Sequence, residues 1–70
     1  MPLTMAEPGK EVIIVRIKGK DEQQKFLERL GFVVGAKVIV ISDIQGNLIV
    51  NIKDSRVAIS KSMANRIFVS

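Results

Sequence analysis

The residue types that most often carry enzyme chemistry are scarce in this sequence of 70 residues. Histidine, cysteine, tyrosine and tryptophan are all absent, so no imidazole, thiol or phenol is available as a nucleophile, a base or a soft metal ligand. The remaining candidates are serines, lysines and carboxylates, which are scattered along the chain and form no recognisable catalytic arrangement. We therefore expect no enzyme activity, no catalytic residue and no cofactor.

Metal and phosphate sites are also poorly supplied. Asp21 and Glu22 form the only adjacent acidic pair, and they stand where a helix is expected to begin, a position that favours negative charge. Helix capping explains this pair better than a metal site does. Gly31 and Gly35 lack the strand–turn–helix context and the Lys-Ser/Thr ending of a phosphate-binding loop. We expect no metal ligands in this chain.

The charge balance indicates which partners the chain could attract. The formal net charge is +4, and the basic residues are spread from Lys10 to Arg66 without a block of like charges. Such a surface suits an acidic protein face or a nucleic acid. Barrels that bind single strands stack bases on exposed aromatic rings, whereas the only aromatic residues here, Phe26, Phe32 and Phe68, stand in apolar surroundings. Protein contact is therefore favoured, and nucleic-acid binding remains the alternative.

The first part of the chain predicts a strand followed by a helix. After the turn signal Pro8-Gly9, the β-branched residues from Val12 to Ile17 predict a strand, with Ile13, Val15 and Ile17 on the core side. Asp21 is the expected N-cap, with Gln24 completing a capping box. The helix is predicted over residues 22–30, with Phe26, Leu27 and Leu30 as its apolar stripe and Gly31 as its C-terminal cap.

The remainder predicts short strands joined by tight turns. The turn signals are Gly46-Asn47 and Asp54-Ser55, and Ser60 or Ser62 could cap a single helical turn through Ala64. Strands are predicted at 38–41, 48–52, 57–59 and 67–69. The first of these is expected to be buried on both faces, or nearly so.

These elements predict a mostly β fold with one helix, in a single domain over residues 1–70. A meander this small must close on itself to hide its edges, so we expect a small SH3-like β-barrel of about five strands, with the helix inserted after the first strand. No apolar run approaches the ~20 residues that a membrane-spanning helix needs, and no secretion signal is visible, so a cytoplasmic location is expected. The predicted core comprises Ile13, Val15, Phe26, Leu30, Val38, Val40, Val50, Ile59 and Phe68.

The order of these features resembles the ferrous iron transport protein A (FeoA) family. The resemblance runs from about Leu3 to Val69, through Pro8-Gly9, the helix ending in Leu30-Gly31-Phe32, Gly35, and Ile67-Phe68-Val69. The ordered set is more specific than any single piece. Two positions depart from the family pattern: Val34 stands where proline usually precedes the glycine, and Asn47-Leu48 stands where Asp-Pro is frequent.

This resemblance implies an accessory protein of ferrous iron uptake. Its implied partner is the cytoplasmic GTP-binding domain of the ferrous iron permease, ferrous iron transport protein B, and no enzymatic activity of its own is implied. Similar domains also occur in iron- and manganese-dependent repressors, so a regulatory domain of that type is a further alternative. An arginine finger acting on the partner could come from Arg16, Arg29, Arg56 or Arg66, and the sequence selects none of them.

Two surfaces are predicted to contact a partner. The first is the helix with its following loop, which offers Lys25, Arg29, Phe32 and Val33; Phe32 could equally fill the end of the barrel. The second is the outer face of the first strand, where Val12 and Ile14 could be covered by the permease or by another copy of the chain. A homo-oligomer is therefore a further alternative.

Overall fold

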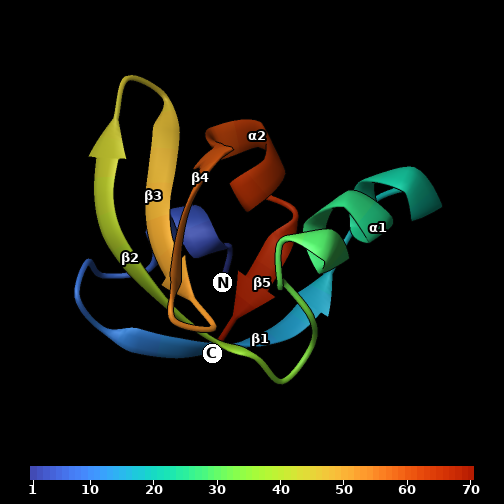
Figure 1. Cartoon of the computed structure of the whole chain (residues 1–70), viewed down its shortest axis with the longest axis horizontal. Coiled ribbons are helices and arrows are strands. Elements are labelled where there is room, and N and C mark those ends of the chain that lie inside the picture. The colour runs from blue at the N-terminus through green and yellow to red at the C-terminus, as the bar shows by residue number, and fades with distance from the viewer.

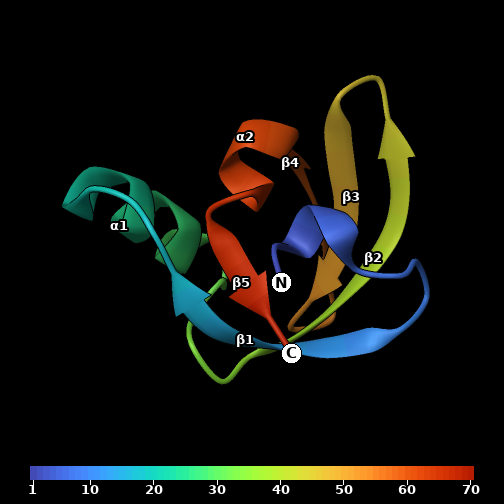
Figure 2. The ribbon, with the colours of Figure 1, turned by 180° about the vertical axis from the view of Figure 1, so that it is seen from behind.

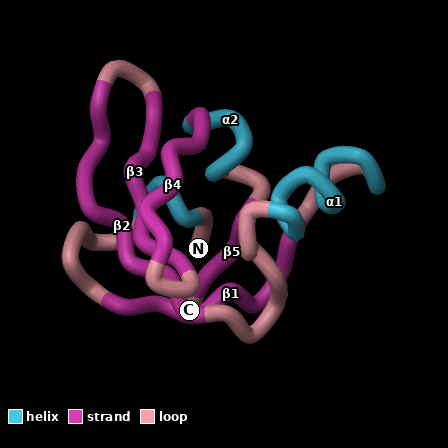
Figure 3. Tube along the Cα trace, in the orientation of Figure 1, coloured by secondary structure: helices cyan, strands magenta, loops and turns pink.

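A computed structural model describes all residues from Met1 to Ser70, and it is built around one antiparallel sheet. Its five strands lie in the order β4-β3-β2-β1-β5. Figure 1 shows the sheet curling round, and Figure 3 shows the strands joined by turns, loops and short helices. The elements are η1 (Leu3–Met5), β1 (Glu11–Ile17), α1 (Asp21–Arg29), β2 (Lys37–Ile44), β3 (Asn47–Ile52), β4 (Ser55–Ser60), α2 (Lys61–Ala64) and β5 (Ile67–Val69).

The curled sheet is closed by short segments at its two edge strands. The helical turn α2 leads directly from β4 into β5, which lies beside β1 (Figure 2). The other edge of β5 is covered by the first residues of the chain, because Pro2 pairs with Phe68 and the Val69 amide donates to the Met1 carbonyl at 2.8 Å. No long strand edge of β5 is therefore left open. The expected small SH3-like barrel, with a helix after the first strand, is confirmed.

A β-bulge in β1 decides which of its side chains enter the core. Ile14 pairs with Val69 but Arg16 pairs with Phe68, so Val15 is an extra residue on β1. An extra residue shifts the alternation of inward and outward side chains. As a result Ile14 and Ile17 face inward, while Val15 and Arg16 are both exposed.

The predicted core face of β1 was therefore wrong. Ile13 is 44% exposed and Val15 is 50% exposed, whereas Val12 and Ile14 are buried. Ile13 pairs with Lys37 of β2, which is also exposed, so this side of the strand faces solvent. Because four consecutive residues from Val12 to Val15 are apolar, hydrophobicity alone does not distinguish the two faces of this strand.

The two hairpins turn one residue earlier than the sequence suggested. Ile44 pairs with Asn47 and Ile52 pairs with Ser55, so each hairpin has a two-residue loop. The loop residues are Gln45-Gly46 and Lys53-Asp54, and all four have positive φ. Two consecutive positive φ values in a two-residue loop are those of a type I′ turn, whose twist matches that of the flanking strands. Three of these four residues are not glycine.

Strands β2 and β3 supply the centre of the core. Val38, Val40 and Val50 are buried, as is Ile59 of β4, which confirms their predicted core positions. Strand β2 is longer than predicted and is not buried on both faces. A second bulge between Val40 and Ser42 leaves Ile41 exposed.

Helix α1 begins one residue earlier than predicted. Lys20 rather than Asp21 is the N-cap residue, and its amide donates to Oε1 of Gln23 at 2.9 Å. Asp21 is the first helical residue, where its charge still favours the positive end of the helix. Nε2 of Gln24 donates to the carbonyl of Gly19 at 3.0 Å, so Gln24 also stabilises this end.

The C-terminal end of α1 is a Schellman motif, which confirms Gly31 as the predicted cap. The amide of Phe32 donates to the Leu27 carbonyl and the amide of Gly31 donates to the Glu28 carbonyl, both at 2.9 Å. Gly31 has a φ of 105°, which a side chain would strain. The motif usually brings its last residue against the helix, and Leu27 and Phe32 are both fully buried here.

The apolar stripe of α1 is narrower than predicted. Leu27 is buried and Leu30 packs partly against the core, but Phe26 is 46% exposed. Phe68 of β5 is also only partly buried. Figure 1 shows why α1 buries little of its surface: the helix lies to one side of the barrel, beyond the end of β1. Phe26 and Phe68 are therefore not members of the closed core.

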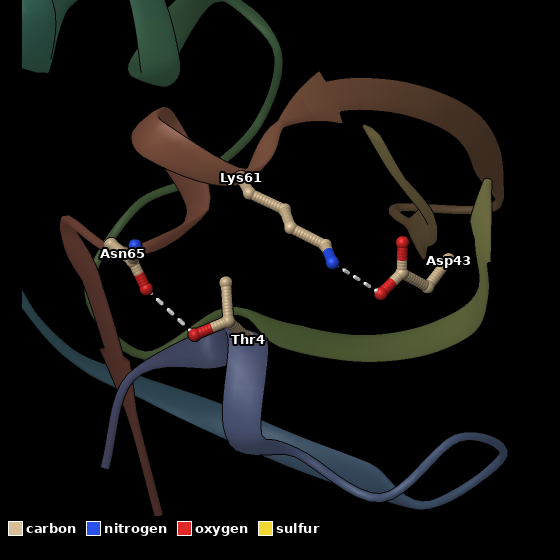
Figure 4. Close-up of polar contacts among 4 residues, drawn as sticks. All are labelled: Thr4, Asp43, Lys61 and Asn65. Carbon is tan, nitrogen blue, oxygen red and sulfur yellow. Dashed lines mark hydrogen bonds and ion pairs between the residues drawn. The ribbon is translucent and has the colours of Figure 1, made fainter. Parts of the chain in front are cut away.

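Polar contacts tie the short helical elements together (Figure 4). The Ser60 hydroxyl accepts a hydrogen bond from the Met63 amide, which confirms Ser60 as the cap of α2. The Thr4 hydroxyl donates to Oδ1 of Asn65 at 2.7 Å, joining η1 to the end of α2. Lys61 of α2 pairs with Asp43 of β2 at 2.7 Å, which joins α2 to the sheet.

Candidate functional site

Part of the predicted contact surface around α1 is exposed. Lys25 and Arg29 stand four residues apart, so they lie on the same side of the helix, and both are exposed. Phe26 adds a half-exposed ring beside them, while Val33 is half-buried and Val34 is 65% exposed in the loop that follows. We call Lys25, Phe26, Arg29, Val33 and Val34 the helix–loop surface.

Three of the predicted contact residues are in the core instead. Val12 is 2% exposed, and Ile14 and Phe32 are fully buried. The β1 bulge turns Ile14 inward, and the Schellman motif turns the chain at Gly31, directly before the buried Phe32. Because a partner cannot reach these side chains without unfolding the chain, the expected exposure of Val12 and Ile14 was wrong, and for Phe32 the core alternative is correct. Neither the permease nor a second copy can cover Val12 and Ile14.

The exposed apolar residues of β1 are their neighbours Ile13 and Val15. They extend along the outer side of the strand, which ends shortly before α1 begins. Sequence reasoning missed them because it placed them in the core. No local signal could have found them, because an outward-facing Arg16 implies by simple alternation that Val15 faces inward, and only the bulge breaks that alternation.

The surface has one hollow, with a volume of about 420 Å³. Its charged residues are Glu11 and Lys37 on one side and Lys53 and Asp54 of the β3–β4 turn on the other. No two of these form an ion pair within 4.0 Å. The hollow contains groups of both signs but no nucleophile held next to a base, which is the arrangement that acyl or phosphoryl transfer uses.

The chain shows neither a cluster of acidic metal ligands nor a membrane-crossing helix. No three or more aspartate or glutamate side chains gather in a group that could hold a metal ion. None of the helices has both the length and the apolar character of a membrane-crossing segment.

Comparison with known proteins gives consistent results. The FeoA domain model matches residues 1–70. A protein of Methanocaldococcus jannaschii named as an Fe(2+) transport protein A is 34% identical over 68 residues, which cover 97% of this chain and 83% of that protein. The crystal structure of an iron uptake regulatory protein (FeoA) superposes with a TM-score of 0.91 at 32% identity, over 99% of this chain and 92% of the other.

Other solved structures share the fold at lower identity. The solution structure of iron(II) transport protein A from Clostridium thermocellum has a TM-score of 0.94 at 24% identity and matches 44% of that chain. A manganese-dependent transcriptional repressor has a TM-score of 0.89 at 19% identity, and the match covers 100% of this chain and 35% of the repressor. At such identities the likeness concerns the fold alone. From the family model and the more similar relatives, the chain belongs to the FeoA domain family, which is assigned to ferrous iron transport.

Proposed function

We propose that this chain is a cytoplasmic, non-enzymatic accessory of ferrous iron uptake that works by binding the cytoplasmic domain of the ferrous iron permease. Family membership supports the role in iron transport. Protein contact as the mode of action is supported by the chemistry of the side chains, since the chain has no histidine, cysteine or tyrosine.

The helix–loop surface is the observation that carries this proposal. It combines two exposed cations, Lys25 and Arg29, with the half-exposed ring of Phe26. Aromatic and arginine side chains contribute strongly to protein interfaces because they bury a large area and make directed hydrogen bonds. Neither cation has a carboxylate partner within 4.0 Å in this chain, so both are free to pair with acidic groups of the permease.

The shape of the molecule also favours α1 as a contact element. The helix stands to one side of the barrel, where a partner can approach it without meeting the sheet (Figure 1). Its capped ends keep it ordered before binding, which reduces the entropy lost on association.

The test is a pull-down and a binding titration with the isolated cytoplasmic domain of the permease. The double variant Lys25→Glu/Arg29→Glu should weaken binding by tenfold or more, about 1.4 kcal/mol, while circular dichroism remains unchanged. The matched control is Lys10→Glu/Arg56→Glu, which alters the net charge equally. Lys10 precedes β1, at the end of that strand remote from α1 (Figure 1), and Arg56 lies on the edge strand β4.

The two variants separate a local contact from a general effect of charge. Equal weakening by both would show that the net charge alone drives binding and would exclude the helix–loop surface. Complete absence of binding by the unmodified chain would refute the proposed partner.

A further inference from the structure

The outer side of the β1–β5 pair has an unusual distribution of charge. Three cations, Arg16, Lys18 and Arg66, gather at its end next to α1, and the apolar residues Ile13 and Val15 continue the surface along β1. The ring of Phe68 lies between the cations, with Nζ of Lys18 5.3 Å from its centroid. We call these six residues the β1–β5 face.

The strand register places like charges directly opposite each other. Ile17 pairs with Ile67, and the Lys18 amide donates to the Arg66 carbonyl at 2.7 Å, so Lys18 stands opposite Arg66. Arg16 stands opposite Phe68 one step along. Like charges in directly opposed positions destabilise a strand pair. The fold therefore gains nothing electrostatically from this arrangement within the chain itself.

The three cations have no internal carboxylate partner. The single ion pair of the structure joins Lys61 of α2 to Asp43 of β2. Nε of Arg66 is buried and donates to no acceptor of the chain, which leaves a donor without its hydrogen bond. Gly19 makes room for this guanidinium, since a side chain at Gly19 would approach Nη1 of Arg66 to 3.3 Å. Arg66 thus has a buried donor without an acceptor and no carboxylate of this chain to pair with.

From this arrangement we propose that the β1–β5 face binds an extended acidic segment of a partner protein. Residues on one face of a strand recur every second position, about 6.6–6.8 Å apart. Carboxylates at alternate positions of an extended segment have the same spacing as Arg16 and Lys18, and arginine can donate two parallel hydrogen bonds to one carboxylate. Apolar side chains farther along the segment would cover Ile13 and Val15. The inference goes beyond the permease contact of α1 and does not depend on it.

Other occupants fit this face less well. A second copy joined by a twofold axis would place the cations against one another. Single-stranded nucleic acid requires exposed rings for stacking, and the ring of Phe68 is half-buried beneath Lys18. Lipid headgroups are recruited by clusters of about four to eight basic residues, more than the three found here.

The test uses isotope-labelled protein and a synthetic peptide with glutamate, then leucine, at alternate positions separated by serine. We expect chemical-shift changes centred on β1 and β5, and an affinity that falls as salt rises. The variant Arg16→Gln/Lys18→Gln should bind the peptide about tenfold more weakly. The matched control Lys53→Gln/Arg56→Gln removes the same charge from the β3–β4 hairpin, at the opposite edge of the sheet, and should bind as the unmodified chain does.

The following outcomes would overturn the inference. Equal weakening in the two variants would assign the binding to net charge, and equal binding of a peptide with lysine in place of glutamate would exclude charge recognition. Binding to phosphatidylserine vesicles or to a DNA oligonucleotide, without binding to the acidic peptide, would assign the face to another class of partner. Spectra that change only near the substituted residues serve to confirm that each variant is folded.

Discussion

Two adjacent isoleucines in β1 allow a direct test of the strand's orientation. Ile14 is fully buried and Ile13 is 44% exposed. Replacing a buried isoleucine by alanine removes three methyl or methylene groups at about 0.8 kcal/mol each and leaves a cavity, which together predict a loss of about 3–4 kcal/mol for Ile14→Ala. The same change at Ile13 removes groups that are roughly half in water and leaves no closed cavity, which predicts a loss of about 1–1.5 kcal/mol.

Urea unfolding followed by circular dichroism measures both values, since the chain has no tryptophan or tyrosine to serve as a fluorescent reporter. The expected difference of about 2 kcal/mol is large against a total stability of about 4–10 kcal/mol for a domain of this size. It corresponds to a difference of about 8–16 °C in Tm. The slope of the unfolding curve should remain constant, so that the midpoint reports stability alone. Equal losses, or a larger loss at Ile13, would refute the bulge and the orientation derived from it.

Three further changes test the turns, a cap and an ion pair. Replacing Lys53-Asp54 by Asn-Gly should raise the free energy of unfolding by about 1 kcal/mol, because asparagine and glycine adopt positive φ more readily; the urea midpoint measures it. Ser60→Ala should lower the stability by about 1 kcal/mol through loss of the α2 cap, seen as a lower Tm. Asp43→Asn should change the stability by less than about 1 kcal/mol, because its pair with Lys61 is solvent-exposed, and the change should shrink in high salt.

Opposite results would be equally informative. A destabilising Asn-Gly turn would mean that the side chains of Lys53 and Asp54 make contacts that outweigh their backbone strain. A neutral Ser60→Ala would mean that α2 is held by packing alone. A large, salt-independent effect of Asp43→Asn would mean that this ion pair is shielded from water.

Local sequence signals placed most elements within a residue or two. The helix was predictable because its apolar stripe is bounded by polar caps and by Gly31, and the strands because β-branched runs alternate with turn residues. The hairpin loops were misplaced by one residue because Gly46-Asn47 is attractive as a pair, whereas the observed loop begins at Gln45. Loop position also depends on which flanking residues pair across the hairpin, and local propensity does not contain that information.

The functional surfaces were harder to predict, for the same physical reason. Lys25 and Arg29 could be recognised because charged residues on a helix are almost always exposed. The β1–β5 face could not, because it depends on the pairing of β1 with β5 from the opposite end of the chain, and on the bulge at Val15. Burial of Phe32 likewise depends on the geometry of the Schellman motif.

The position of α1 outside the barrel has a consequence for its motion. The helix is anchored by Leu27 and, in part, by Leu30, whereas β2 and β3 are held by ladders of hydrogen bonds and by the main core. Elements with few buried contacts open by local unfolding at a lower free energy than the whole domain does. The amides of α1 should therefore exchange with deuterium before those of the sheet. A partner that grips the helix would slow that exchange selectively, which makes α1 a built-in reporter of binding.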